Sequence, residues 1–243
     1  MISFDSLASS SAGCAYRLSA DGMAPLLIEC GLPFPQLQKA LDFKVSELAG
    51  CLVSHWHADH ALAAGKLSER GVRVYGSEDT LDRLRLLFRG QHTLEPMRTE
   101  WVGLRPWRVT PFDAVHDCPG TMGFVIKGGG AKCLYLSDSA YCRYRFEGLT
   151  HIFIECNHSA EIVRERDRRG EFPHEAYRRT IQNHMSLERL IEMLKANDLS
   201  KVQEIHLLHL SDGNSDERAF KEAVQKATGV PVHIAPKLGT GAL

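Results

Sequence analysis

His55, His57, Asp59 and His60 lie within six positions of one another, and these are residue types that bind metal ions. The apolar residues 51–53 precede them and predict a strand, on which alternate side chains face the same way. His55 and His57 could therefore bind one ion together. Asp59 and His60 follow where the chain turns, and a carboxylate beside an imidazole suits a second ion. The segment predicts a metal site rather than a solvated turn.

Three further candidate ligands each come at the end of a predicted apolar strand: His116, Asp138 and His209. Because active sites in layered αβ proteins gather where strand ends open into loops, we expect these residues to join the first four. The simplest assembly gives metal 1 to His55, His57 and His116, gives metal 2 to Asp59, His60 and His209, and makes Asp138 the bridging carboxylate. Two divalent ions, zinc or manganese, would lower the pKa of a bound water toward ~7 and neutralise charge on an attacked oxygen. That is the chemistry of a hydrolase.

The elements that must position these residues alternate along the chain. Apolar runs with turn signals predict strands over residues 4–8, 15–18, 25–30, 51–53, 72–75, 105–115, 123–127, 132–136, 149–155, 204–209 and 231–234. Helical spacing predicts helices over residues 34–41, from 77, from about 175, over 186–196 and over 216–227. Residues 162–170 form a polar, arginine-rich stretch to which we assign no helix or strand.

Composition limits the protein class. A chain of 243 residues with 44% hydrophobic content can bury a large core, and no linker divides it, so we expect one α/β domain over residues 1–243. The formal charge of −1 means that affinity for polyanions must come from a local basic patch or bound metal. Seven cysteines without a Cys-x-x-Cys pair, and no signal peptide or membrane span, indicate a cytoplasmic protein. Trp101 and Trp107 could line a substrate or subunit surface, although packing is the commoner role.

The ligand order His-x-His-x-Asp-His, lone His, Asp and final His resembles that of the metallo-β-lactamase superfamily. The resemblance covers essentially the whole chain and implies an αββα sandwich, of mixed α/β (α+β) class, with a two-metal site at one edge. Residues 183–186 and 208–211 further resemble the paired histidine motifs of the tRNase Z and PhnP phosphodiesterases. In those enzymes the first histidine contacts the scissile phosphate. Carried over, His184 would donate a hydrogen bond or proton to the phosphate or leaving oxygen, and Asp59 would orient the attacking hydroxide. The alternative is that His184 only caps the following helix.

The narrowest resemblance is to the WalJ (YycJ) family of bacterial DNA exonucleases. Its motifs match this chain at residues 7–13, 54–60, 116–117, 123–124, 136–138, 155–158, 178–179, 183–186 and 209–211. The resemblance makes Asn157 and His158 candidates for contact with the substrate or with the ligands. Arg178 and Arg179 belong to an arginine-rich region that could hold successive DNA phosphates. A Ser-Ser-Ser loop stands where Ser-Gly-Ser is expected, and Cys156 replaces a serine.

Three functions remain open from the sequence. The first is a two-metal phosphodiesterase that acts on DNA, most simply an exonuclease. The second keeps the same site but hydrolyses a cyclic nucleotide or another small phosphodiester, which a chain without a large nucleic-acid clamp would allow. The third is a non-catalytic, metal-stabilised nucleic-acid-binding protein, although an intact ligand set with room for water exceeds what a structural zinc needs. Oligomeric state is undetermined, and no membrane partner is expected.

Overall fold

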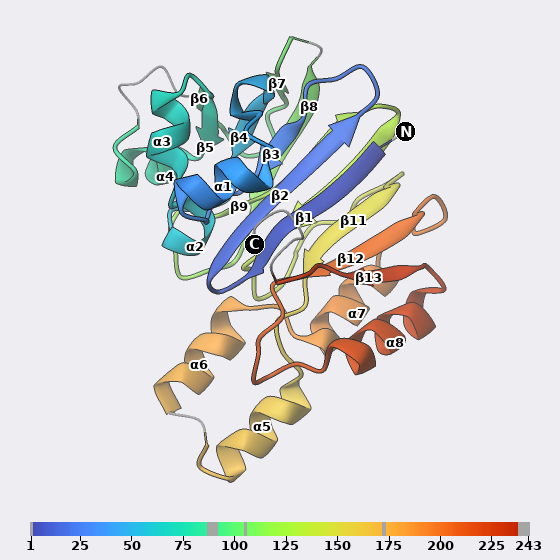
Figure 1. The fold of residues 1–243 in the computed structure, drawn as a ribbon. Helices are drawn as coiled ribbons and strands as arrows, with labels where there is room; N and C mark the ends of the chain where they lie inside the picture. The colour runs from blue at the N-terminus through green and yellow to red at the C-terminus, as the bar shows by residue number, and fades with distance from the viewer. Residues whose placement is uncertain (1, 87–91, 105, 172–173, 238–243) are drawn as a thin grey trace. The chain divides into compact units, whose positions relative to one another are not determined.

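The chain forms two compact units. Unit 1 contains residues 1–113, 118–132 and 236–243, and unit 2 contains residues 114–117 and 133–235. The computed structural model, drawn in Figure 1, describes residues 2–86, 92–104, 106–171 and 174–237. The expectation of one domain over residues 1–243 stays a prediction.

Unit 1 is built on a mixed sheet whose strands follow the order of the chain: β1 (Ile2–Ser10), β2 (Gly13–Ala20), β3 (Leu26–Ile28), β4 (Gly50–Leu52), β5 (Val74–Gly76) and β6 (His92–Thr93). The first three strands are antiparallel neighbours, and the pairs from β3 to β6 are parallel. The parallel strands β3, β4 and β5 are completely buried, which matches their continuous apolar runs. Their carboxyl ends therefore share one edge, and the histidine-rich segment begins at that edge.

Short helices connect the parallel strands of unit 1: α1 (Phe34–Ala40), the 3₁₀ helix η1 (Val45–Glu47), α2 (Ala58–Ala61), α3 (Ala64–Glu69) and α4 (Glu78–Arg83). Leu37, Leu67 and Leu81 bury their side chains in one core cluster with residues of β3, β4 and β5. The start predicted at residue 77 is confirmed, because Ser77 caps α4 by accepting a hydrogen bond from the Thr80 amide.

An antiparallel ribbon completes the described strands of unit 1: β7 (Glu100–Val102), β8 (Trp107–Asp113) and β9 (Met122–Gly128). The strands predicted over 105–115 and 123–127 correspond to β8 and β9, and residue 105 lies outside the described residues. Trp107 has no exposed surface, and its indole nitrogen donates a hydrogen bond to the Ala24 carbonyl at 2.9 Å. Trp107 is therefore a packing residue, whereas Trp101 is 60% exposed.

Unit 2 is a parallel sheet with helical connections. Its strands are β10 (Ala131–Leu136, in unit 2 from Cys133), β11 (His151–Glu155), β12 (Glu204–Leu208) and β13 (Val232–Ile234). Its helices are α5 (Ala160–Arg168), α6 (His174–Asn183), α7 (Leu187–Lys195) and α8 (Glu217–Thr228). Figure 1 shows these helices in yellow to red, with α5 and α6 at the lower left.

The helices of unit 2 start where side-chain caps satisfy their first amides. Ser186 accepts from the Arg189 amide and Asp216 accepts from the Ala219 amide, so the helices predicted over 186–196 and 216–227 are confirmed. Helix α5 was not predicted, because Val163 is its only buried residue and the apolar period is weak. No helix in the described part of the chain is long and apolar enough to cross a membrane.

Candidate metal centre

The predicted ligands of unit 1 lie together at the carboxyl end of β4. Nε2 of His55 is 3.0 Å from Nδ1 of His57, and the His55 and His60 rings have centroids 4.2 Å apart. Nε2 of His60 lies 3.7 Å from Oδ2 of Asp59. His55 and His60 are fully buried. Two imidazole nitrogens so close together suit two bonds of ~2.1 Å to one ion, and the assignment of these residues as ligands stays a prediction.

The backbone of β3 and its following loop fixes this histidine segment. The Cys30 amide donates to the His60 carbonyl at 2.7 Å, beside the point where the chain enters α2. A Cβ atom at Gly31 would lie 1.7 Å from the Asp59 carbonyl oxygen and 2.8 Å from the His60 nitrogen. The Asp59–His60 peptide therefore packs at a distance that only a glycine at position 31 permits.

Glu29 supports the same segment, and sequence reasoning did not identify it. Its carboxylate is completely buried and accepts the Ser54 amide, with Nδ1 of His60 at 3.6 Å. Ser54 in turn lies 2.9 Å from Nδ1 of His55 through its hydroxyl. Such partners orient imidazole ligands and select the tautomer that faces a metal. The available signal was a glutamate directly after the buried apolar strand β3.

The predicted ligands of unit 2 also converge. Nε2 of His116 lies 3.8 Å from Oδ2 of Asp138, and Nδ1 of His209 lies 3.3 Å from Oδ1 of Asp138. Asp138 and His209 follow the ends of β10 and β12 and have left-handed backbones, with φ of 47° and 51°. Left-handed backbones are uncommon for residues other than glycine, although Asp and His adopt them more readily than most, and they concentrate at functional sites.

Glu155 occupies the centre of the unit 2 cluster. Its Oε1 accepts from Nδ1 of His184 at 2.6 Å and lies 3.2 Å from Nδ1 of His209. Its Oε2 accepts the amides of Ser139 and Met185. Ligand atoms of Asp138, Glu155, His184 and His209 all lie within 4.8 Å of one another. Like Glu29, Glu155 ends a completely buried strand, and sequence reasoning assigned it no role.

The charges at Glu155 and His184 stabilise each other. Burial alone would raise the pKa of Glu155, but the His184 charge and the hydrogen bonds from both histidines lower it to about 2. Burial alone would lower the pKa of His184, but the Glu155 carboxylate raises it above its usual value. Glu155 is therefore ionised, and His184 is biased toward the protonated imidazolium.

His116 is oriented by the end of helix α6. Its Nδ1 donates to the Asn183 carbonyl at 3.1 Å, while Nε2 lies 3.2 Å from Oδ1 of Asp117 and 3.8 Å from Oδ2 of Asp138. The Asn183 amide nitrogen donates to Oδ2 of Asp117 at 2.8 Å, and Nε of Arg179 lies 3.4 Å from the same oxygen. Arg179 is thus joined to the loop that carries His116.

The other predicted substrate contacts lie close to the same ligands. The Asn157 side chain donates to the His209 carbonyl at 3.0 Å, so it braces a candidate ligand. His158 is only 2% exposed, and burial lowers its pKa to about 4. Arg178 is exposed on α6. The helix α7 is capped by Ser186 rather than by His184, whose Nδ1 is bonded to Glu155.

Comparison with protein families decides the classification. A model of the β-lactamase superfamily domain matches residues 26–209, which includes every candidate ligand from His55 to His209. The chain belongs to the β-lactamase superfamily. Among curated relatives in this superfamily, exodeoxyribonuclease YycJ of Bacillus anthracis is 26% identical, over 89% of this chain and 85% of that protein. Exodeoxyribonuclease WalJ of Streptococcus pneumoniae is 25% identical, over 86% of this chain and 81% of that protein.

Solved structures give the same fold. The metallo-β-lactamase fold protein YhfI of Bacillus subtilis has a TM-score of 0.74 at 17% identity and covers 97% of both chains. Zinc-bound PqqB of Methylobacterium extorquens has a TM-score of 0.71 at 14% identity and covers 98% of both chains. A diphosphatase of the PhnP family has a TM-score of 0.65 at 16% identity, over 98% of this chain and 96% of that chain. The predicted αββα metallo-β-lactamase fold, with mixed sheets and flanking helices, is confirmed.

The donor set fits zinc or manganese. Buried imidazoles and carboxylates are ligands for zinc or manganese, and each unit supplies a cluster of them whose orientation is fixed by a buried glutamate. The chain is therefore a metallo-hydrolase of the β-lactamase superfamily with candidate His and Asp metal sites.

Proposed function

We propose that the chain is a two-metal phosphodiesterase whose substrate is DNA, and that it acts as an exonuclease. The contact between Glu155 and His184 carries the proposal, because it places a partly buried imidazole, whose pKa the carboxylate raises, next to candidate metal ligands. Hydrolysis of a phosphodiester needs such a proton donor for the leaving oxygen. Two curated relatives that are exodeoxyribonucleases support DNA as the substrate class.

The proposed ligand set keeps the sequence assignment. His55, His57 and His116 would hold the first ion, and Asp59, His60 and His209 would hold the second, with Asp138 bridging. When bound, the two ions would lower the pKa of a water toward ~7 and neutralise charge on the attacked phosphate oxygen. The protein residues around them supply orientation and proton transfer.

His184 and Asp59 have separate proposed roles. Nδ1 of His184 is bonded to Glu155, so Nε2 is the nitrogen left to donate a proton to the leaving oxygen. Asp59 is partly exposed, and one carboxylate oxygen lies near His60, so the carboxylate can orient an attacking water while it contacts the second ion. Arg178 and Arg179 would contact phosphates away from the scissile bond.

A substrate panel tests this proposal. Protein loaded with zinc or manganese is incubated with labelled DNA, a cyclic nucleotide and bis(p-nitrophenyl) phosphate, beside the Asp59→Ala and His184→Ala variants. His233→Ala is the matched control, because that imidazole is half exposed on β13. We expect DNA cleavage that both site variants lose and the control retains. Turnover of the small esters without DNA cleavage would instead assign a small-phosphodiester hydrolase.

A further inference from the structure

Three side chains form a row across the antiparallel ribbon of unit 1. Trp101 on β7 is the register partner of Arg108 on β8, and Arg108 is the partner of Lys127 on β9. All three are exposed, and the Arg108 guanidinium carbon lies 5.3 Å from the Trp101 ring centroid. Like charges directly opposite one another destabilise a sheet. The pair Arg108 and Lys127 therefore does not contribute to the stability of the fold, and another role must account for it.

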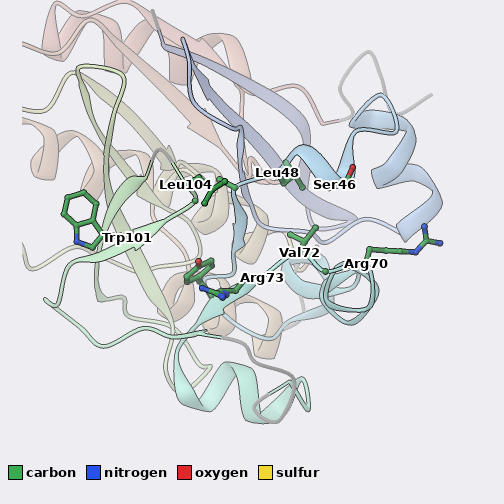
Figure 2. Close-up of a pocket in the computed structure, with 11 residues that line it drawn as sticks. Ser46, Leu48, Arg70, Val72, Arg73, Trp101 and Leu104 are labelled. Atoms are coloured by element: carbon green, nitrogen blue, oxygen red, sulfur yellow. The ribbon is translucent and has the colours of Figure 1, made fainter.

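Two hollows adjoin this row. The first has a volume of about 390 Å³ and is lined by residues that include Arg70, Arg73, Tyr75, Trp101 and Leu104. Figure 2 shows Arg73 below Leu104, with Trp101 to one side. The second hollow, of about 520 Å³, shares Leu104 and includes Arg108 and Lys127 in its lining. Neither lining contains a carboxylate.

Close backbone packing builds the first hollow. Gly103, with φ of +90°, brings the β7–β8 turn against Ala49, and a Cβ at position 103 would lie 2.9 Å from the Ala49 Cβ. A Cβ at Gly50 would lie 2.7 Å from the Tyr75 ring. Leu104 is fully exposed at this turn. At both glycines the backbone packs against its neighbours at distances that a side chain would not allow.

Three cations beside these hollows have no acidic partner among the residues that the structure describes. Arg73, Arg108 and Lys127 form no ion pair with any carboxylate in residues 2–86, 92–104, 106–171 and 174–237. By contrast, Arg98 near the start of the ribbon pairs with Glu95 and Glu100. A chain with a net charge of −1 therefore concentrates unneutralised positive charge around one exposed indole.

We propose that this surface, the basic face formed by Arg73, Trp101, Arg108 and Lys127, binds single-stranded DNA outside the metal centre. The three cations would contact successive phosphates, and a base would stack on Trp101, as in other single-strand sites that combine charge with aromatic platforms. This inference rests on the proposed function for its choice of DNA as ligand, but the binding itself requires no metal and no cleavage.

The position of the basic face sets a length requirement. It lies at the amino ends of β4 and β5, whereas the histidine segment follows the carboxyl end of β4. Five residues of extended chain, from Gly50 to His55, span roughly 16 Å. A single DNA strand that reaches both places must therefore be longer than this separation, which a 20-mer is.

The test is fluorescence anisotropy of labelled oligothymidylates with the full chain in EDTA. We expect Trp101→Ala and the double variant Arg108→Ala/Lys127→Ala to weaken binding of a 20-mer about tenfold or more. The double variant should also reduce the slope of log K against log salt by about 1.4. The control is Arg218→Ala/Lys221→Ala, which removes the same charge from the exposed side of α8. It should bind like the wild type.

Equal weakening by the basic-face and α8 double variants would overturn the proposal, because it would show a net-charge effect. No binding of the 20-mer by the wild type in EDTA would overturn it as well. Hydrolysis of bis(p-nitrophenyl) phosphate by the metal-loaded basic-face variants distinguishes a failure of the DNA-binding site from a failure of the proposed phosphodiesterase function. Binding that depends on the basic face without any DNA cleavage would retain this site and reject the nuclease assignment. Cleavage of a 20-mer with unchanged KM in the basic-face variants would retain the nuclease assignment and reject this binding site.

Discussion

Nδ1 of His184 lies 2.6 Å from Oε1 of Glu155, and this contact joins the loop before α7 to the end of β11. The same carboxylate also reaches His209 and two backbone amides. One buried glutamate therefore fixes a candidate proton donor and a candidate metal ligand together. Replacement of Glu155 should therefore change the rate of catalysis, the pH dependence of that rate and the stability of the fold, and each effect can be measured separately.

Replacing Glu155 with glutamine should change the pH profile of catalysis. The carboxylate holds the pKa of His184 above its usual value against the opposing effect of burial. Without it, His184 should lose its proton at lower pH, so the alkaline limb of kcat should move toward acid and kcat at neutral pH should fall about 10²-fold. A pH–rate profile for Glu155→Gln measures this. An unchanged alkaline limb would show that His184 is not the titrating acid.

The same pair predicts a stability maximum in metal-free protein. Because the folded pKa of Glu155 is about 2, below 4.5, its contribution is full above pH 4.5 and is lost as the pH falls. Because the folded pKa of His184 is raised above 6.5, its contribution is full below pH 6.5 and is lost as the pH rises through the raised value. The thermal midpoint in EDTA should therefore contain a component that is greatest between pH 4.5 and 6.5. Glu155→Gln should remove that component, and identical profiles for both proteins would refute the ion pair.

Removal of His184 should matter most for poor leaving groups. An alkoxide leaving from DNA needs a proton, whereas p-nitrophenolate leaves without one. His184→Ala should reduce DNA cleavage by about 10²–10⁴-fold and reduce bis(p-nitrophenyl) phosphate hydrolysis much less. Parallel kinetics on the two substrates provide the measurement. An equal loss on both would assign His184 to substrate binding or to support of the fold.

Gly31→Ala should damage the metal centre without a change in any ligand. Its methyl group would meet the Asp59 carbonyl oxygen, so the Asp59–His60 peptide must move. We expect a clear loss of bound zinc or manganese, measured by equilibrium dialysis and metal analysis. Gly65→Ala is the matched control, because a Cβ there meets nothing within 4 Å and lies inside α3. The control should bind metal normally and gain about 0.5–1 kcal/mol of stability.

The ligand clusters could be predicted because their signal is local. His55, His57, Asp59 and His60 occur within six positions, and Asp138 and His209 directly follow apolar strands. Strand periodicity therefore located them without knowledge of the tertiary structure. The ordered pattern of ligand types also indicated the superfamily.

The supporting residues could not be predicted in the same way. Glu29 and Glu155 acquire their roles from partners 25 and 29 positions away, Ser54 and His184, and a single glutamate at a strand end does not identify those partners. The role of Gly31 depends on the close approach of the Asp59 carbonyl oxygen, which sequence spacing does not reveal. Helix α5 was missed because it buries too few apolar residues to produce a helical period.

The most direct test of the central claim is end-labelled DNA digestion with defined metal content. Purified protein is stripped, reloaded with zinc or manganese, and incubated with 5′- and 3′-labelled single-stranded and duplex DNA. The account predicts stepwise release of label from one end, dependent on metal and absent in His184→Ala. No release with either metal, from either end, would contradict the DNA exonuclease assignment.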